Sequence, residues 1–187
     1  MTKSAPTPAL ASIHTLAFDF DGVFTDNKVS VDETGRESVR CDRADGLGFD
    51  LVRAFQRRGQ FHADIFILSK ETNPVVMARA AKLKLACHAS CGDTLAFMQE
   101  RLARLRPADP DPMAGVVYVG NDLNDLRLMS RVGFAVAPAD AHPMVLRIAH
   151  LVMDQRGGEG FVRAVIERLL SVDRCSPETL DELLSGH

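Results

Sequence analysis

Residues 16–26 read Leu-Ala-Phe-Asp-Phe-Asp-Gly-Val-Phe-Thr-Asp, in which an apolar run ends in two aspartates one residue apart. The apolar run predicts a short buried β-strand from His14 to Phe20. Because side chains alternate between the faces of a strand, Asp19 and Asp21 are expected to project from the same side at its carboxyl end. The sequence thus attaches two carboxylates to the end of a rigid, buried element.

The rest of the chain alternates between strand-like and helix-like patterns. Further strands are predicted at Ala63 to Leu68, Leu85 to His88, Gly115 to Val119, Phe134 to Ala137 and His150 to Met153. Helices are predicted at Asp45 to Arg58, Pro74 to Lys84, around the apolar stripe Leu95, Met98, Leu102 and Leu105, and at Leu123 to Arg131, Met144 to Ile148 and Phe161 to Leu170. Apolar strands separated by helices indicate an α/β fold, a Rossmann-like parallel sheet flanked by helices.

One core is expected to span residues 13–172 of the 187, since 46% of the chain is hydrophobic. Within it, residues 24–42 predict a projecting β-hairpin, called the flap below, with strands at Lys28 to Val31 and Glu37 to Cys41 around a polar turn. Residues 1–12 are rich in Ala, Pro, Ser and Thr and are expected to be disordered. Residues 173–187 are expected to form a tail or short helix.

Charge and composition exclude several classes of function. The formal net charge of −3, with signs interspersed, argues against a nucleic-acid partner. No segment has the apolar length of a signal peptide or membrane span, so a cytoplasmic protein without a membrane partner is expected. Cys87-His88-x-x-Cys91 could supply three soft ligands to zinc, but no fourth ligand has suitable spacing, and reduced thiols are the preferred interpretation.

Polar clusters follow several of the predicted strands, at the ends where ligands bind in such sheets. A carboxylate in the position of Asp19 can attack phosphorus, and Asp21 can then protonate the leaving group. Ser69 can hold a phosphoryl oxygen, and the oxygens of the loop 121–125 suit a hard Mg²⁺ ion. Taken singly, each of these features also has a structural interpretation as a capped turn or helix-capping loop.

The order and spacing of these clusters resemble the haloacid dehalogenase superfamily of phosphotransferases over residues 16–170. The resemblance implies a nucleophile at Asp19, an acid/base at Asp21 and a phosphate contact at Ser69. The Mg²⁺ site that it implies consists of Asp19, the backbone carbonyl of Asp21 and Asn121, with Asp122 as an alternative ligand and Asp125 as a support.

The chain has no room for a separate cap domain. The short flap, residues 45–48 (Asp45-Gly46-Leu47-Gly48), 139–143 and 156–160 resemble the capless phosphatases of sugar-acid biosynthesis, in the lipopolysaccharide and sialic acid pathways. That resemblance implies a phosphorylated keto sugar acid as substrate, contacted by Asp45 and Gly46. It also implies a homotetramer in which the flap and tail of one subunit help to close a neighbour's site.

The sequence Ser69-Lys70-Glu71 stands where the enzymes of octulosonate 8-phosphates usually show Thr-Gly-Arg. It is more similar to the branch that acts on nonulosonate 9-phosphates. That resemblance implies that Glu71 recognises polar groups of the substrate, while Arg79 and Lys82 meet its carboxylate. Arg79 and Lys82 also lie three residues apart on a helix, so a solvated helix face is the alternative interpretation.

The chain departs from the family pattern at the start of its third helix, where Thr94 replaces a lysine. Losing one such charge typically costs ~10²–10³ in rate, unless another cation, with Lys70 and Lys82 as candidates, takes its place. Asn121 likewise supplies a neutral oxygen where aspartate is usual. Two functions therefore stay open, a working phosphatase and a pseudo-phosphatase that serves as an oligomerisation or regulatory module.

Overall fold

The computed structural model describes residues 5–185 and has a six-stranded, fully parallel sheet at its centre. In spatial order the strands are β5 (Ala86–His88), β4 (Asp64–Leu68), β1 (Thr15–Phe18), β6 (Val116–Val119), β7 (Phe134–Ala137) and β8 (Leu151–Val152). The predicted α/β fold is confirmed. The predicted strand at His150 to Met153 is longer than β8, which pairs with β7 through two residues at the sheet edge.

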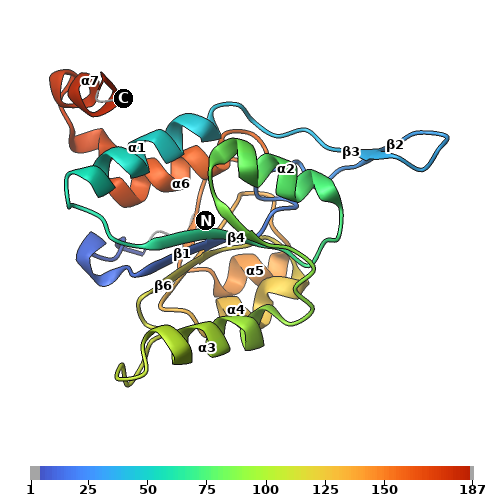
Figure 1. Ribbon diagram of the computed structural model, residues 1–187, viewed down its shortest axis with the longest axis horizontal. Coiled ribbons are helices and arrows are strands. Elements are labelled where there is room, and N and C mark those ends of the chain that lie inside the picture. The colour runs from blue at the N-terminus through green and yellow to red at the C-terminus, as the bar shows by residue number, and fades with distance from the viewer. Residues whose placement is uncertain (1–4, 186–187) are drawn as a thin grey trace.

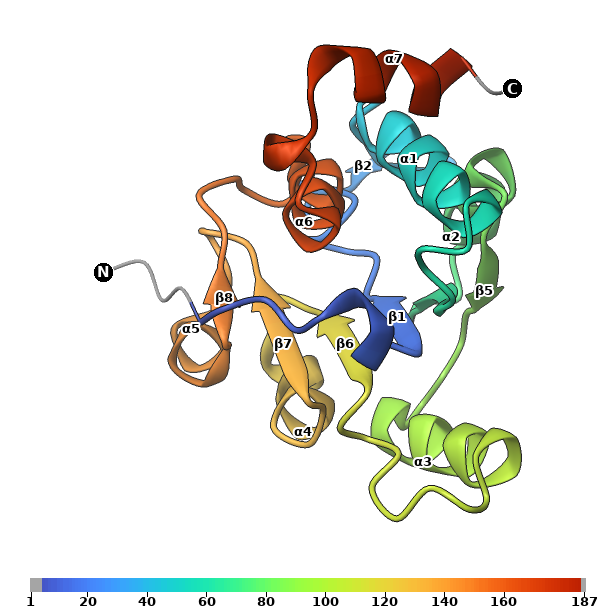
Figure 2. The ribbon, with the colours of Figure 1, turned by 90° about the vertical axis from the view of Figure 1, so that its left-hand side faces the viewer.

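Helices cover both faces of the sheet (Figures 1 and 2). One face carries α1 (Asp45–Arg57), α2 (Pro74–Leu83) and α6 (Phe161–Leu170). The other carries α3 (Thr94–Leu105), α4 (Leu126–Met129) and α5 (Pro143–Ile148). The prediction of a single helix at Leu123 to Arg131 is wrong. Its first turn is a 3-10 helix, η2 (Leu123–Asp125), and a capping box between Asp122 and Asp125 closes that turn.

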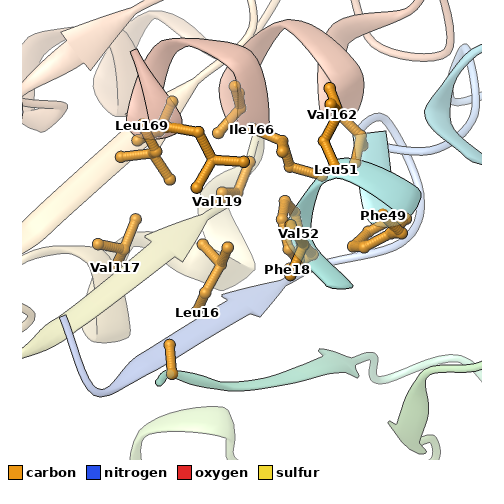
Figure 3. Packing of buried hydrophobic residues seen from close by; sticks show 14 of the residues in the cluster. Leu16, Phe18, Phe49, Leu51, Val52, Val117, Val119, Val162, Ile166 and Leu169 are labelled. Atoms are coloured by element: carbon orange, nitrogen blue, oxygen red, sulfur yellow. The ribbon is translucent and has the colours of Figure 1, made fainter. Parts of the chain in front are cut away.

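The alternation of side chains along β1 divides the core between the two faces. Leu16 and Phe18 point toward α1 and α6, where Phe18 packs edge-on against Phe49 (Figure 3). Ala17 points the other way, toward the cluster that contains Met98 of α3. Fully burying a large apolar side chain contributes roughly 1.5–3 kcal/mol, so this packing holds the carboxyl end of β1 in place.

The flap is a narrow hairpin that projects from one end of the molecule (Figure 1). Its strands, β2 (Ser30–Val31) and β3 (Glu37–Ser38), have two residues each and are shorter than predicted. The carboxylate of Asp32 accepts hydrogen bonds from the turn, including the backbone N–H groups of Thr34 and Arg36, at 2.9 Å each. An antiparallel bridge between Thr25 and Cys41 closes the base.

Both terminal segments have defined contacts in the described part of the chain. Residues 1–4 of the expected disordered segment lie outside it, but Leu10–Ser12 form a 3-10 helix and Ala5 donates to the carbonyl of His150 (3.1 Å). Near the other end, α7 (Pro177–Ser185) packs against α1 through the buried side chain of Leu183. Within residues 5–185, no helix has the length and apolar character needed to cross a bilayer.

Candidate active site

Three loops meet at one edge of the sheet, at the point where the strand order reverses beside β1. Open α/β sheets bind their ligands at such points. Asp19 follows β1, Ser69 follows β4 and Asn121 follows β6. A pocket of about 210 Å³ opens here, lined by Asp19, Asp21, Asn27, Ser69, Lys70, Glu71, Asn121, Asp122 and Asn124. The structure therefore brings together residues that the sequence places about 50 positions apart.

The loop after β1 is held by hydrogen bonds that fix both aspartates. The backbone N–H of Asp19 donates to Val119 of β6 (2.8 Å), and its side chain is only 6% exposed. The buried hydroxyl of Thr25 accepts from the N–H of Gly22 (3.1 Å) and lies 3.4 Å from an Asp21 carboxylate oxygen, to which it donates. Asp19 is thus fixed by the sheet and Asp21 by the turn that follows.

Gly22 is required where the first loop passes the loop after β6. Its φ of +73° is left-handed, and an added Cβ would lie 1.9 Å from Nδ2 of Asn121. Gly157 lies equally close, since its own Cβ would stand 2.0 Å from the carbonyl oxygen of Gly22. The N–H of Gly157 donates to Asp140 (3.0 Å). Segment 156–160 therefore packs against the Asp19 loop, and segment 139–143 is joined to it through Asp140.

The loop after β6 is organised around the carboxylate of Asp125. One of its oxygens accepts from the hydroxyl of Tyr118 (2.7 Å), and the other accepts from the N–H groups of Asn121 (2.9 Å) and Asp122 (3.1 Å). Asp122 in turn caps Leu123 (2.7 Å). Both oxygens of Asp125 are therefore engaged within the protein, so this residue shapes the loop.

Burial dominates the protonation of the two aspartates. It raises the pKa of Asp19 well above its usual value, and the nearby carboxylate of Asp125 adds to this while the N–H of Phe20 opposes it. Burial also raises the pKa of Asp21, with a further rise from Glu71 and an opposing hydrogen bond from Thr25. The pocket is consequently a site where a cation would be strongly stabilised.

The oxygen atoms of the pocket fit a hard divalent cation. Oδ1 of Asn121 is buried and has no hydrogen-bond partner within residues 5–185, an arrangement that is costly unless a ligand completes it. Over the same residues, no three His, Cys, Asp or Glu side chains form a group that could hold a metal ion. A cation here would therefore rely on Asp19 together with neutral oxygens, as Mg²⁺ can.

The turn Ser69–Glu71 is joined to the neighbouring β5–α3 loop. The carbonyl of Ser69 accepts from the N–H of Cys91 and that of Glu71 accepts from Ser90, each at 3.0 Å. Within the turn, the buried Ser69 hydroxyl accepts from the N–H of Glu71 (3.1 Å). The position of Lys70 between these two anchored residues is therefore well defined.

From Glu71 the pocket continues as a groove between the flap and α2. Two adjoining cavities of about 260 and 700 Å³ both include Glu71, and flap residues line their other side. Asn73, at the start of α2, donates to Glu37 of the flap (2.6 Å) across this groove. A substrate with its phosphate at Asp19 could extend along this groove.

Several residues assigned to the site from the sequence do not line the pocket or its groove. Asp45 is fully buried at the start of α1, with Gly46 beside it, and accepts from the N–H of Arg163 (3.2 Å). Arg79 donates to the carbonyl of Asp42 at the flap base (2.5 Å), and Lys82 lies exposed on α2.

Thr94 is the first residue of α3, is 4% exposed and likewise lies outside the pocket lining. The N-terminus of that helix is capped by Asp93, whose carboxylate accepts from Leu95 and Ala96 (3.1 Å each). The start of α3 thus presents no cation to the pocket, and two N–H groups of its first turn are taken up by Asp93.

Asn124, in the predicted Mg²⁺ loop 121–125, lines the pocket, and Thr25 and Asn27 belong to the site although the sequence did not single them out. Asn27 lines both the pocket and the groove and has a left-handed φ of +60°. Asparagine adopts that conformation more readily than most residues, but a single asparagine carries too weak a signal to be selected from sequence. Thr25 lies within the stretch 16–26, after Asp21, but that pattern does not indicate its role.

The fold and the pocket together define a hydrolase of the haloacid dehalogenase type. A search against models of known protein families finds no match. The chain is 32% identical over 161 residues to 3-deoxy-D-manno-octulosonate 8-phosphate phosphatase KdsC of Yersinia pestis, covering 86% of this chain and 81% of the relative. The chain belongs to the KdsC family and is a phosphatase.

Two solved structures support this assignment. The Yersinia pestis phosphatase superposes with a TM-score of 0.75 at 30% identity, covering 95% of this chain and 87% of that one. A Streptomyces avermitilis chain assigned to the HAD family of hydrolases gives a TM-score of 0.79 at 35% identity, covering 92% and 95%. The similarity therefore extends over nearly all of the fold.

Proposed function

We propose that this phosphatase hydrolyses the phosphate monoester of a keto sugar acid, with Asp19 as the nucleophile and Asp21 as the acid and base. The observation that carries the proposal is the position of Asp19, buried at the end of β1 in a pocket that it shares with Ser69 and Asn121. A fixed carboxylate beside phosphate-binding groups is suited to attack phosphorus.

The reaction then proceeds in two displacements. A carboxylate oxygen of Asp19 forms a bond to phosphorus, the bond from phosphorus to the ester oxygen breaks, and Asp21 gives its proton to that oxygen. Water next attacks the phosphorus of the aspartyl-phosphate and transfers a proton to Asp21. Inorganic phosphate leaves, and both side chains regain their starting states. Ser69 orients the phosphoryl oxygens through its hydroxyl.

Mg²⁺ is the proposed cofactor, held by Asp19, the backbone carbonyl of Asp21 and the side-chain oxygen of Asn121. When bound, it supplies positive charge that offsets the charge of the phosphate. Asp125 holds the Asn121 loop in shape, since both of its oxygens already accept hydrogen bonds. One oxygen of Asp122 already caps Leu123, so Asp122 is proposed only as the alternative ligand.

The substrate is proposed to be a nonulosonate 9-phosphate, in preference to an octulosonate 8-phosphate. Glu71, in the Ser69-Lys70-Glu71 turn, lines the pocket and both parts of the groove, where it can accept hydrogen bonds from substrate hydroxyls. Lys28 and Arg36 line the groove further out and can meet the carboxylate of the sugar acid. The name of the Yersinia relative supports the octulosonate ester as the competing substrate.

A further proposal is that the chain works in the cytoplasm as a homotetramer, and the flap supports the assembly. Val29 and Val31 of the flap are 50% and 59% exposed. Each flap strand has only two residues. A hairpin this small has little stability of its own in water. A second copy of the chain that covered the two valines would supply the missing contacts.

The catalytic proposal is tested by phosphate release from both esters with Mg²⁺. The nonulosonate 9-phosphate should be cleaved faster, EDTA should abolish the reaction, and Asp19→Asn should lower the rate at least ~10³-fold. Asp111→Asn, a matched change in the exposed loop after α3, should leave the rate unchanged. If the wild-type chain releases phosphate from neither these esters nor a wider panel, the proposal fails and a pseudo-phosphatase role replaces it.

The assembly proposal is tested by light scattering of the eluting protein. The wild-type mass should correspond to four chains, and Val29→Asp combined with Val31→Asp should give smaller species. Leu105→Asp changes an apolar residue of similar exposure, 55%, at the end of α3 and should leave the tetramer intact. A monomeric wild-type chain would contradict the proposal.

A further inference from the structure

The pocket contains far more negative than positive charge. Its lining includes the acidic side chains of Asp19, Asp21, Glu71 and Asp122, of which Asp21 is protonated when it acts as the acid, and Lys70 is the cationic side chain among the described residues that line it. A phosphate monoester would add up to two further negative charges. With a divalent cation bound, the net charge of the occupied pocket is still negative. The positive charge of Lys70 is therefore well placed to stabilise the phosphoryl group during its transfer.

The backbone on either side of Lys70 is fixed, while its side chain remains available. The residues before and after it accept hydrogen bonds from Cys91 and Ser90 of the β5–α3 loop, at 3.0 Å each. Lys70 itself forms no ion pair with any residue in the range 5–185. Its ammonium group is therefore free to pair with an anion in the pocket.

The positive charge of Lys70 also influences Cys91, a residue of the β5–α3 loop. Burial raises the pKa of the Cys91 thiol and the carboxylate of Asp93 raises it further, whereas the charge of Lys70 lowers it. Lys70 thus lines the pocket that contains Asp19, and its charge is felt at Cys91 in the loop that leads into α3.

No other described cation competes for this position. At the start of α3, Thr94 is uncharged, and Arg127 is 71% exposed and pairs with Asp93 (2.9 Å). Lys28 lines the groove but not the pocket and lies 3.9 Å from Asp26. Among the described residues that line the pocket, the cation able to contact the phosphoryl group is therefore Lys70 of the Ser69–Glu71 turn.

We propose that Lys70 is a catalytic residue whose ammonium group contacts the transferring phosphoryl group and neutralises the charge that develops on it. Lys70 supplies from the β4–α2 turn the positive charge that Thr94 cannot supply from the start of α3. The role rests on the proposed phosphatase mechanism, and it includes no covalent step of its own.

The test is Lys70→Met, assayed for phosphate release from the preferred ester and for Mg²⁺-dependent binding of inorganic phosphate by calorimetry. Phosphate release should fall by ~10²–10³-fold in kcat/KM, and the Kd of phosphate should rise at least ~10-fold. Lys70→Arg, which keeps the charge, should recover at least a tenth of the wild-type rate. Lys84→Met removes the same charge from the exposed end of α2 and should match the wild type in both measurements.

The outcomes separate this inference from the proposed function. If the wild type is active and Lys70→Met stays within threefold of it in both rate and phosphate affinity, Lys70 has no catalytic role although the phosphatase mechanism stands. If the wild type releases phosphate from no ester, the proposed function fails and the catalytic role of Lys70 fails with it. A large loss of rate and affinity, restored by arginine, supports the inference.

Discussion

Asp45 gives the stability of the fold a pH dependence that a single substitution should remove. Its carboxyl is fully buried at the start of α1 and accepts one hydrogen bond, from the N–H of Arg163. Burial raises its pKa from 3.8 to about 6, and Asp42 contributes to the rise. That N–H group and the charges of Arg79 and Arg163 oppose the rise without cancelling it.

The sign follows from comparing the folded and unfolded chains. Well below pH 3.8 the carboxyl is protonated in both, so its ionisation costs nothing. Between about pH 4 and 6 the unfolded chain releases the proton while the folded chain retains it, and stability falls as the pH rises. At about 1.36 kcal/mol per pKa unit, the full loss is ~3 kcal/mol, of which ~1.6 has accrued by pH 5 and ~2.9 by pH 7.

Asp45→Asn cannot ionise, so it should gain stability relative to the wild type as the pH rises. We expect the difference in unfolding free energy between variant and wild type to shift by about 1.3 kcal/mol toward the variant from pH 5 to pH 7, measured by urea denaturation at one protein concentration. Effects of the new amide that are independent of pH cancel in this comparison.

Asp181→Asn, on the exposed face of α7, is the matched control and should show the same small difference at both pH values. A difference for Asp45→Asn that stays constant, or that shifts toward the wild type at pH 7, would refute the buried, proton-retaining state of Asp45.

Three further substitutions test the loops of the site. Gly22→Ala should lower phosphate release at least ~10-fold and stability by ~1–3 kcal/mol, measured by assay and thermal melting, because its Cβ collides with Asn121. Tyr118→Phe should cost ~1–3 kcal/mol in urea unfolding, because it leaves a buried acceptor of Asp125 unpaired. Thr94→Lys should change kcat/KM less than ~3-fold, because the pocket already has a cation.

Each of these predictions has its own control or contrary outcome. Gly59→Ala has a similar φ of +67° but nothing within 4 Å of the new Cβ, so it should destabilise the fold without loss of catalysis. For the tyrosine, a variant as stable as the wild type would show that the hydrogen bond to Asp125 contributes nothing. A gain of tenfold or more from Thr94→Lys would show that the pocket lacks a positive charge, contrary to the role of Lys70.

The sheet and the centre of the site could be predicted from the sequence because both depend on short-range patterns. Apolar runs mark buried strands, and parallel strands place their carboxyl ends at one edge of a sheet. Asp19, Ser69 and Asn121 each follow such a run. Predicting that they lie together therefore required only the order of the strands.

The orientation of residues on α1 and α2 could not be predicted in this way. Whether Asp45 and Arg79 face the groove depends on how each helix rotates as it packs, and their spacing along the sequence does not specify that rotation. The structure buries Asp45 against α6 and directs Arg79 to the flap base. Close contacts such as that between Gly22 and Asn121 likewise exist only after two distant loops have met.

The flap enters and leaves the core at a single place, the bridge between Thr25 and Cys41. Beyond Asn27, which itself lines the pocket, the hairpin can change in length while the ends of β1, β4 and β6 keep their positions in the sheet. The hairpin is therefore a natural point for grafting. Flaps of different size or sequence could be exchanged there to redirect the enzyme toward other leaving groups, with the phosphate-handling centre left intact.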